Sequence, residues 1–181
     1  RNWTRLLRMS LVMDLEIIDN FLSNHEFQSI EKTLMGEWFP WYYNPFILQK
    51  EKESGKSQFT QFTHTFFSVN PPYNGNNSRH FDLLIPCLKK LRCYGLHRIK
   101  ANLTQGTIFH KRTGYHTDSE DMITAVLYIN TCNGYTRFKK GKNVKSVANR
   151  MVIFDSNLQH CGVTSTNSQR RVVINFNFRR E

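Results

Sequence analysis

Apolar residues recur every three or four positions in two stretches of the first half of the chain, which is the spacing of one helix face. The first stretch contains Phe27, Ile30 and Leu34. Ser23 precedes it and is followed three residues later by Glu26, a capping-box pattern that satisfies free N–H groups at a helix start. We therefore predict one helix over residues 23–35 and, from the same spacing, a second over residues 79–92.

After about residue 97 the apolar residues fall into short runs rich in β-branched and aromatic types, separated by Gly, Asn and Ser turns. These runs cover residues 98–104, 123–130, 135–138, 144–148, 151–155 and 172–178. Such spacing indicates an antiparallel sandwich or barrel, for example a jelly roll. Residues 15–19 and 59–69 also have an extended pattern. We expect a mainly β fold with flanking helices packed on the outside of the β-core.

Two unusual segments lie between the first predicted helix and the extended stretch that begins at residue 59. Residues 38–43 are aromatic, and they are expected either to border the mouth of a pocket or to be plain core. Gln49–Gln58 is polar and charged with a glycine near its centre. This composition predicts a mobile loop, and we expect it to act as a flap beside the site.

The length of 181 residues suits one domain. We assign that domain to residues 13–181, with helical support over about 15–95 and a β-core over about 97–179. Residues 1–12 match no element of the pattern and are interpreted as an upstream or added leader, with Met13 as the candidate native start. The oligomeric state is not determined by any of these patterns.

Cellular location can be inferred from the cysteines and from the apolar runs. The spacing of the four cysteines fits neither a zinc ribbon nor a CxxC motif, and a chain of this length does not need disulfide staples. No apolar run approaches the length of a membrane span, and no secretory signal pattern is found. We therefore expect reduced thiols, a cytoplasmic protein and no membrane partner.

The formal net charge of +11 raises the question of an acidic partner such as nucleic acid. Part of this excess lies in the leader. Another part lies in one basic run, which contains Arg137, Lys139, Lys140, Lys142 and Lys145. A run of this kind is usually a solvated hairpin, so we favour an ordinary basic protein and keep nucleic acid as the alternative.

The candidate chemistry begins with His116 and Asp118. Residues i and i+2 of a strand point to the same face, so an imidazole nitrogen and a carboxylate oxygen can aim at one point. His160, at the start of a later β-run, can supply a third ligand. Two histidines and one carboxylate form the facial triad of non-haem iron(II) oxygenases, which leaves open positions for a 2-oxo acid and dioxygen.

An HxD triplet alone is weak support for a metal site, because most such triplets are surface accidents. The order of features is more informative: the triplet, a gap of about forty residues, a histidine and then a strand that carries arginine. The remaining histidines are expected to be ordinary ones. They are His25, His64, His80, His97 and His110.

With these residues in place, residues 99–178 resemble the catalytic double-stranded β-helix (a cupin-like jelly roll) of the 2-oxoglutarate oxygenases. The resemblance is closest to the prolyl-4-hydroxylase branch and extends to small hydroxylase-like proteins encoded by marine phages. The matching segments are residues 116–118, 124–130 (T-x-x-x-Y-L-N in the family), 133–138 (G-G-x-L-x-x-F), 150–155 (R-x-x-x-F), His160 and the Arg170-Arg171 strand. The sequence departs from the family at Asn133, where glycine is usual, and this affects a turn only.

The resemblance implies a set of ligands. His116, Asp118 and His160 would bind Fe(II), and an arginine fork would bind the distal carboxylate of the co-substrate 2-oxoglutarate. Of the two neighbouring arginines we choose Arg171 over Arg170, because Arg171 shares its strand face with a small apolar and a polar residue, as in the family. Tyr128 matches a tyrosine that binds the same carboxylate, although a core tyrosine is an equal interpretation. Asn102 is a weaker candidate for this pocket.

The implied activity is that of an oxidoreductase, a dioxygenase that consumes 2-oxoglutarate and O2 and releases succinate and CO2, with ascorbate as a supporting reductant. We expect a peptide substrate hydroxylated at proline. The alternatives are an oxygenase that acts on nucleic acid and a non-catalytic binding module. An intact triad together with the arginine argues against the non-catalytic module, and the basic run is the main support for nucleic acid.

Overall fold

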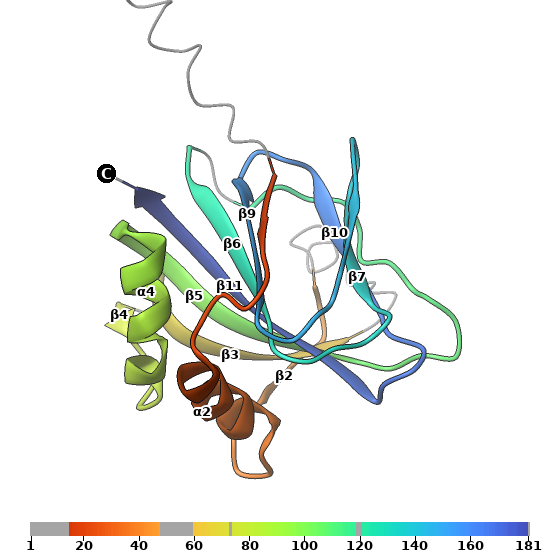
Figure 1. Cartoon of the computed structure of the whole chain (residues 1–181), viewed down its shortest axis with the longest axis horizontal. Coiled ribbons are helices and arrows are strands. Elements are labelled where there is room, and N and C mark those ends of the chain that lie inside the picture. The colour runs from red at the N-terminus through yellow and green to blue at the C-terminus, as the bar shows by residue number, and fades with distance from the viewer. Residues whose placement is uncertain (1–14, 48–59, 73, 119–120, 181) are drawn as a thin grey trace, which may run out of the picture.

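The computed structural model describes residues 15–47, 60–72, 74–118 and 121–180 (Figure 1). The predicted flap Gln49–Gln58, the leader over residues 1–12 and the candidate start Met13 lie outside the described residues. The elements, in chain order, are β1 (Glu16–Ile18), α2 (Asn24–Met35), β2 (Tyr42–Asn44), β3 (Gln61–Ser68), β4 (Gly75–Asn76), η1 (Phe81–Leu84), α4 (Ile85–Leu91), β5 (Cys93–Gln105), β6 (Ile123–Tyr128), β7 (Tyr135–Phe138), β8 (Asn143–Lys145), β9 (Arg150–Asp155), β10 (His160–Val163) and β11 (Arg170–Arg180).

Helix α2 forms as the sequence predicts. Ser23 is its N-cap, and the Ser23 side chain and the Glu26 side chain satisfy each other's backbone N–H groups in a capping box. The second predicted helix is divided: it begins as the 3-10 turn η1 and continues as α4. Pro86 lies in the first turn of α4 and lacks the N–H that a continuous α-helix would bond to the carbonyl four residues earlier.

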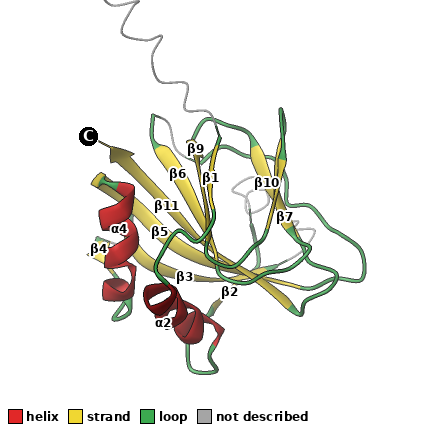
Figure 2. Cartoon of the chain, in the orientation of Figure 1, coloured by secondary structure: helices red, strands yellow, loops and turns green. Residues whose placement is uncertain are grey.

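The strands form two antiparallel sheets. The larger has eight strands in the order β1-β9-β6-β11-β5-β3-β2, with β4 paired to β3, and the smaller has the order β10-β7-β8. Figures 1 and 2 show α2 and α4 on the outer side of the larger sheet, while the smaller sheet lies on its inner side. The expected mainly β, jelly-roll architecture with external helices is confirmed. Strand β8 is shorter than predicted and ends at Lys145.

The larger sheet separates two environments. On its helix side, alternate residues of the central strands join α2 and α4 in the main core, which includes Ile99, Leu103, Leu127, Ile153, Ile174 and Phe176. On the inner side lies a second, smaller apolar cluster, which contains Val126, Tyr128, Phe138, Val144, Val152, Phe154 and Val173. The cavity that contains the candidate site borders this cluster, since Val126 and Val173 also line it.

Two further expectations concern the thiols and the membrane. All four cysteines are free, and Cys87, Cys132 and Cys161 are buried. None of the helices among the described residues has the length and apolar character that a membrane crossing requires.

Candidate metal centre and cavity

A cavity of about 560 Å³ lies between the two sheets. Its floor is the inner face of β5 and β11, and its other walls include residues 113–118 and the start of β10. This volume is within the range of small-molecule sites in proteins. The candidate metal ligands lie together in its wall.

Backbone pairing brings the two candidate histidines side by side. His116 and His160 form an isolated antiparallel bridge in which each backbone N–H donates to the other's carbonyl oxygen at 3.0 Å. Their rings consequently lie 4.6 Å apart between centroids. Asp118 follows His116 by two residues, and its side chain joins the same group, although residues 116–118 form an isolated bridge and a loop and not the predicted strand.

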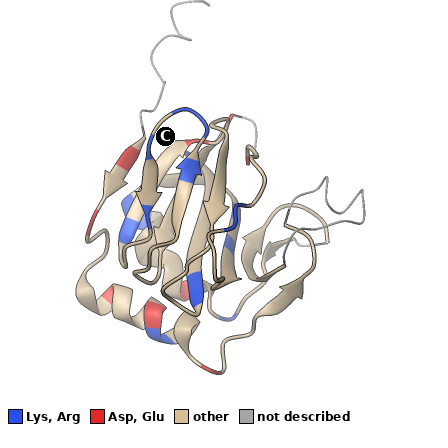
Figure 3. Ribbon diagram, turned by 90° about the vertical axis from the view of Figure 1, so that its right-hand side faces the viewer, with Lys and Arg blue, Asp and Glu red and all other residues tan. Residues whose placement is uncertain are grey.

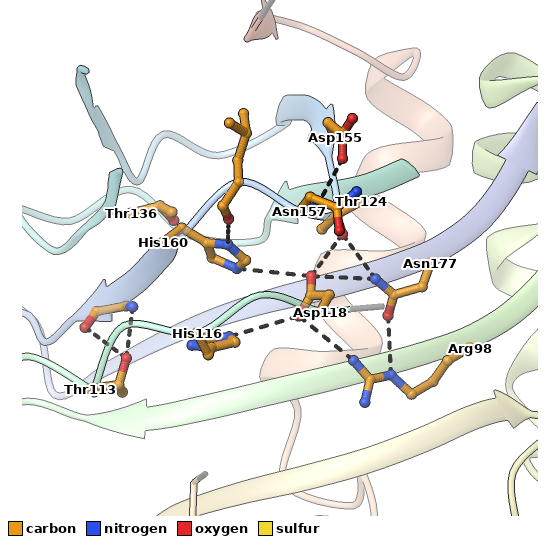
Figure 4. Close-up of polar contacts among 12 residues, drawn as sticks. Arg98, Thr113, His116, Asp118, Thr124, Thr136, Asp155, Asn157, His160 and Asn177 are labelled. Atoms are coloured by element: carbon orange, nitrogen blue, oxygen red, sulfur yellow. Dashed lines mark hydrogen bonds and ion pairs between the residues drawn. The ribbon is translucent and has the colours of Figure 1, made fainter. Parts of the chain in front are cut away.

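The three side chains converge on one point (Figure 4). His116 Nε2 lies 3.7 Å from Asp118 Oδ1, and His160 Nε2 lies 3.8 Å from Asp118 Oδ2. Ligands about 2.1 Å from a common ion and at right angles to each other would be roughly 3 Å apart. Small side-chain rotations would therefore close the triad around an ion.

Each histidine is oriented through its other ring nitrogen. His116 Nδ1 lies 3.2 Å from the Gly114 carbonyl oxygen, and His160 Nδ1 lies 2.9 Å from that of Leu158. A carbonyl can only accept, so Nδ1 is the donor in each contact, and in the neutral ring Nε2 then presents its lone pair toward Asp118. Burial and the neighbouring His160 also lower the pKa of His116, against the opposite effect of Asp118. Neutral histidines with free Nε2 atoms are suitable metal ligands.

Asp118 is held by a buried polar network that sequence reasoning missed (Figure 4). Its Oδ2 accepts hydrogen bonds from Thr124 Oγ1 at 2.7 Å and from Asn177 Nδ2 at 3.3 Å. Asn177 Oδ1 in turn accepts from Arg98 Nε at 3.1 Å, and Arg98 Nη2 lies 3.9 Å from Asp118 Oδ1. Burial alone would raise the pKa of Asp118, but His160, His116, Thr124 and Arg98 outweigh it, so the pKa lies below its usual range.

Arg171 and Arg170 lie on opposite faces of β11. Arg171 lines the cavity, is 5% exposed and donates from Nη2 to Thr136 Oγ1 at 3.1 Å. Its Nε is buried and has no hydrogen-bond partner among the described residues, so the guanidinium is incompletely bonded. Arg170 instead donates to the Met35 carbonyl at the end of α2.

The other two predicted co-substrate residues differ in position. Asn102 lines the cavity from β5. Tyr128 is fully buried in the smaller apolar cluster, where its hydroxyl donates to Thr136 Oγ1 at 2.7 Å. The Arg171 guanidinium carbon lies 5.4 Å from the centre of the Tyr128 ring. Tyr128 thus contacts the two residues, Arg171 and Thr136, that line the cavity in front of it.

The aromatic segment 38–43, which runs into β2, is not among the described residues that line this cavity. Phe39 and Trp41 pack in the helix-side core, so core is the correct interpretation for these two. Trp38, Tyr42 and Tyr43 are exposed. On this side the cavity is lined by Ile47 and Gln61.

The residues present fit a divalent metal with a bidentate oxo acid. The triad offers two nitrogens and one carboxylate oxygen in a facial arrangement, which is the ligand set of non-haem iron(II) oxygenases. The unpartnered Nε of Arg171 supplies a buried donor that a carboxylate would satisfy. The triad and the unpartnered Arg171 Nε are both features of this chain's own side chains.

Comparison with known proteins finds solved structures that have a similar fold. No protein-family model matches the sequence, and no curated protein matches it. The structure is similar to an oxidoreductase of the 2OG-Fe(II) oxygenase family from Burkholderia pseudomallei, with a TM-score of 0.65 and 11% identity over 98% of this chain and 89% of that chain. It is also similar to a prolyl hydroxylase from Trichoplax adhaerens in complex with a hypoxia inducible factor peptide fragment, with a TM-score of 0.63 and 12% identity over 91% and 83% of the two chains.

A third similar structure, the non-heme alpha ketoglutarate dependent epimerase SnoN from nogalamycin biosynthesis, has a TM-score of 0.61 and 9% identity over 92% of this chain and 76% of that chain. The chain therefore has the fold of the 2-oxoglutarate and Fe(II) oxygenases and prolyl hydroxylases, as the resemblance of its motifs implied. Because this fold serves hydroxylation in one relative and epimerisation in another, it does not determine the substrate.

Proposed function

We propose that this protein is an Fe(II)- and 2-oxoglutarate-dependent dioxygenase that hydroxylates a peptidyl, and specifically prolyl, substrate with release of succinate and CO2. One observation carries the proposal. His116, Asp118 and His160 converge in the wall of a cavity that also contains the buried, incompletely bonded guanidinium of Arg171. A metal site and a carboxylate site in the same cavity are what a 2-oxo acid needs to bind by both ends.

Each residue of the site has a defined task. His116, Asp118 and His160 would hold the iron, and Gly114, Leu158, Thr124 and Asn177 orient these ligands through their hydrogen bonds. Arg171 would bind the distal carboxylate, with Thr136 and Tyr128 fixing the guanidinium from behind. Asn102 would line the co-substrate pocket. Bound iron would supply the oxidising chemistry that uses O2, with ascorbate as a supporting reductant.

A peptide is favoured as the substrate over nucleic acid. The similar prolyl hydroxylase from Trichoplax adhaerens is described in complex with a peptide. Among the described residues that line the cavity, Tyr115 is the only Phe, Tyr or Trp side chain, whereas a flipped base requires stacking above and below it. The exposed lysines of the basic run lie in the turn between β7 and β8 and on β8, and Figure 3 shows Lys and Arg residues at several separate places on the face that it presents. We also propose a cytoplasmic location, because four free cysteines suit a reducing compartment.

Succinate release tests this function. The protein is incubated with Fe(II), 2-oxoglutarate, ascorbate and O2, and a library of proline-containing peptides is compared with alkylated oligonucleotides. We expect peptides to stimulate succinate release and oligonucleotides to have no effect. Stimulation by oligonucleotides alone, with turnover that falls steeply as salt rises, would replace the peptide with nucleic acid. His160→Ala is the inactive control.

A further inference from the structure

The floor of the cavity carries more positive charge than the proposed reaction needs. Among the described residues that line it, three are cations, Arg98, Lys100 and Arg171, and one is a carboxylate, Asp118. If the proposed function holds, the two charges of Fe(II) and the two of 2-oxoglutarate cancel each other. The described lining then retains an excess of two positive charges, which a neutral substrate would leave in place.

Two of the three cations already have partners. Arg98 contacts Asp118 and Asn177, and Arg171 contacts Thr136 and the ring of Tyr128. The Lys100 side chain has no hydrogen bond or ion pair with any other described residue, although it lines the cavity and is partly buried. Placing a cationic ammonium in such a position costs free energy unless a negative group compensates it.

The register of the sheet places Lys100 near the metal triad. Along β5 it follows Arg98, the partner of Asp118, by two residues and therefore lies on the same face. Directly opposite Lys100 on β11 is Asn175, whose side-chain Oδ1 is buried and has no hydrogen-bond partner in the described part of the chain. Lys100 and Asn175 are cross-strand neighbours with unused polar atoms at the same cavity. This is the pattern expected where both face a third group.

We propose that Lys100 is a specificity-determining residue that binds a carboxylate of the primary substrate, close to the carbon that is oxidised, with Asn175 beside it. The substrate class thereby narrows from a prolyl peptide to one whose target proline is flanked by an acidic side chain or by a free C-terminal carboxylate. This assignment rests on the proposed function, because the excess charge is counted with iron and 2-oxoglutarate bound.

A binding selection tests the assignment without turnover. The protein is loaded with Mn(II) and the unreactive 2-oxoglutarate analogue N-oxalylglycine. It is then exposed to a defined library of proline peptides in matched pairs, with Asp or Glu against Asn or Gln next to proline, and with free against amidated C-termini. Bound peptides are counted by mass spectrometry. We expect carboxylate members to be enriched about tenfold over their amide partners, the effect of one charge-assisted contact. The matched pairs that differ in enrichment show whether the carboxylate comes from an acidic side chain or from the C-terminus.

Variants test whether Lys100 causes the preference for peptides that carry a carboxylate. Lys100→Met should abolish the enrichment, Lys100→Arg should retain it, and Lys100→Glu should invert it toward peptides with Lys or Arg beside proline. Lys145→Met, which removes an exposed lysine of the basic run, is the matched control and should behave as the wild type.

Two results would overturn the assignment: no enrichment with the wild-type protein, or the same enrichment with Lys100→Met. An unchanged preference in Lys100→Met together with a large increase in the KM for 2-oxoglutarate would assign Lys100 to the co-substrate, and this also contradicts it. Failure of the proposed function has a different signature, namely no succinate release with any peptide, whatever the selection shows.

Discussion

The two faces of β5 and β11 are built from alternate residues of the same strands, yet they have opposite characters. On the helix side these strands present Ile99, Ala101, Leu103, Val172, Ile174, Phe176 and Phe178, all buried in the main core. On the cavity side they present Arg98, Lys100, Asn102, Thr104, Arg171, Val173, Asn175 and Asn177. Neighbouring residues of one strand thus have different positions, since one packs in the core that stabilises the fold and the next faces the cavity.

The contrast between the apolar and the polar face explains how the protein can keep a charged cavity in its interior. Buried polar groups without full hydrogen bonding cost free energy, and Asn175 Oδ1 and Arg171 Nε are such groups. The apolar burial on the opposite face of the same strands offsets that cost and holds the polar side chains in a fixed geometry. Substitutions on the two faces should therefore have different consequences.

The largest difference is expected between the neighbours Phe176 and Asn175. Phe176→Ala should lower the free energy of unfolding by about 3–5 kcal/mol, because it leaves a cavity in the core. Asn175→Ala should change it by less than about 1 kcal/mol in either direction, since it removes an oxygen that makes no hydrogen bond. Urea unfolding of both variants measures this. Equal losses would show that the two faces are not specialised.

The two adjacent arginines, Arg170 and Arg171, lie on opposite faces of β11 and should differ in their effect on 2-oxoglutarate binding. Arg171→Ala should raise the apparent KM for 2-oxoglutarate by about a hundredfold, because a buried carboxylate would lose its charged partner. Arg170→Ala removes a hydrogen bond to the Met35 carbonyl, so it should cost about 1 kcal/mol of stability and leave that KM nearly unchanged. Initial rates of succinate release at varied 2-oxoglutarate decide between them. The reverse pattern would transfer the co-substrate site to Arg170.

A smaller effect is expected for Asn177, which positions Asp118 without reaching the metal itself. Asn177→Ala should weaken metal binding by about tenfold, the lower end of what loss of a supporting hydrogen bond costs. Asn102→Ala, on the same face but outside the Asp118 network, is the control. Calorimetric titration with Mn(II) provides the affinity without any turnover. Equal affinities for the two variants would remove the positioning role.

The smallest effect should come from an exposed ion pair, which sets a baseline for the buried polar contacts. Arg150 donates to both carboxylate oxygens of Asp19, at 2.6 and 2.9 Å, and this hydrogen bonding lowers the pKa of Asp19. A lowered folded-state pKa means stabilisation that is present above the unfolded value, about 4, and is lost as the pH falls through the folded value. Asp19→Asn should cost at most about 1 kcal/mol at neutral pH and nothing in strong acid. A cost that persists in acid would contradict this origin.

What the sequence predicts depends on how far apart the interacting residues are. The capping box of α2 involves residues three apart, and the alternation along strands involves residues two apart, so both were predicted correctly. The network of Arg98, Asn177 and Asp118 was missed. Arg98 and Asn177 are 79 residues apart in the chain and meet only because the register of β5 against β11 pairs them. No local pattern contains that register.

The candidate site shows the same limit. A histidine and a carboxylate two residues apart are visible in the sequence, whereas their meeting with His160 depends on a backbone bridge between distant segments. The resemblance to a known family supplied that link. The position of Lys100 in the cavity could not be predicted from the sequence. A lysine in an extended run is expected to face solvent, and only the structure shows that this strand forms the cavity floor.

The central claim is most directly tested by metal binding itself. Anaerobic calorimetric titration of the wild-type protein with Fe(II), followed by 2-oxoglutarate, should show one metal site, and 2-oxoglutarate should bind only after the metal. His116→Ala, Asp118→Ala and His160→Ala should each abolish metal binding while thermal unfolding shows an intact fold. Wild-type protein that binds no metal, or a folded triad variant that binds it as well as the wild type, would contradict the account.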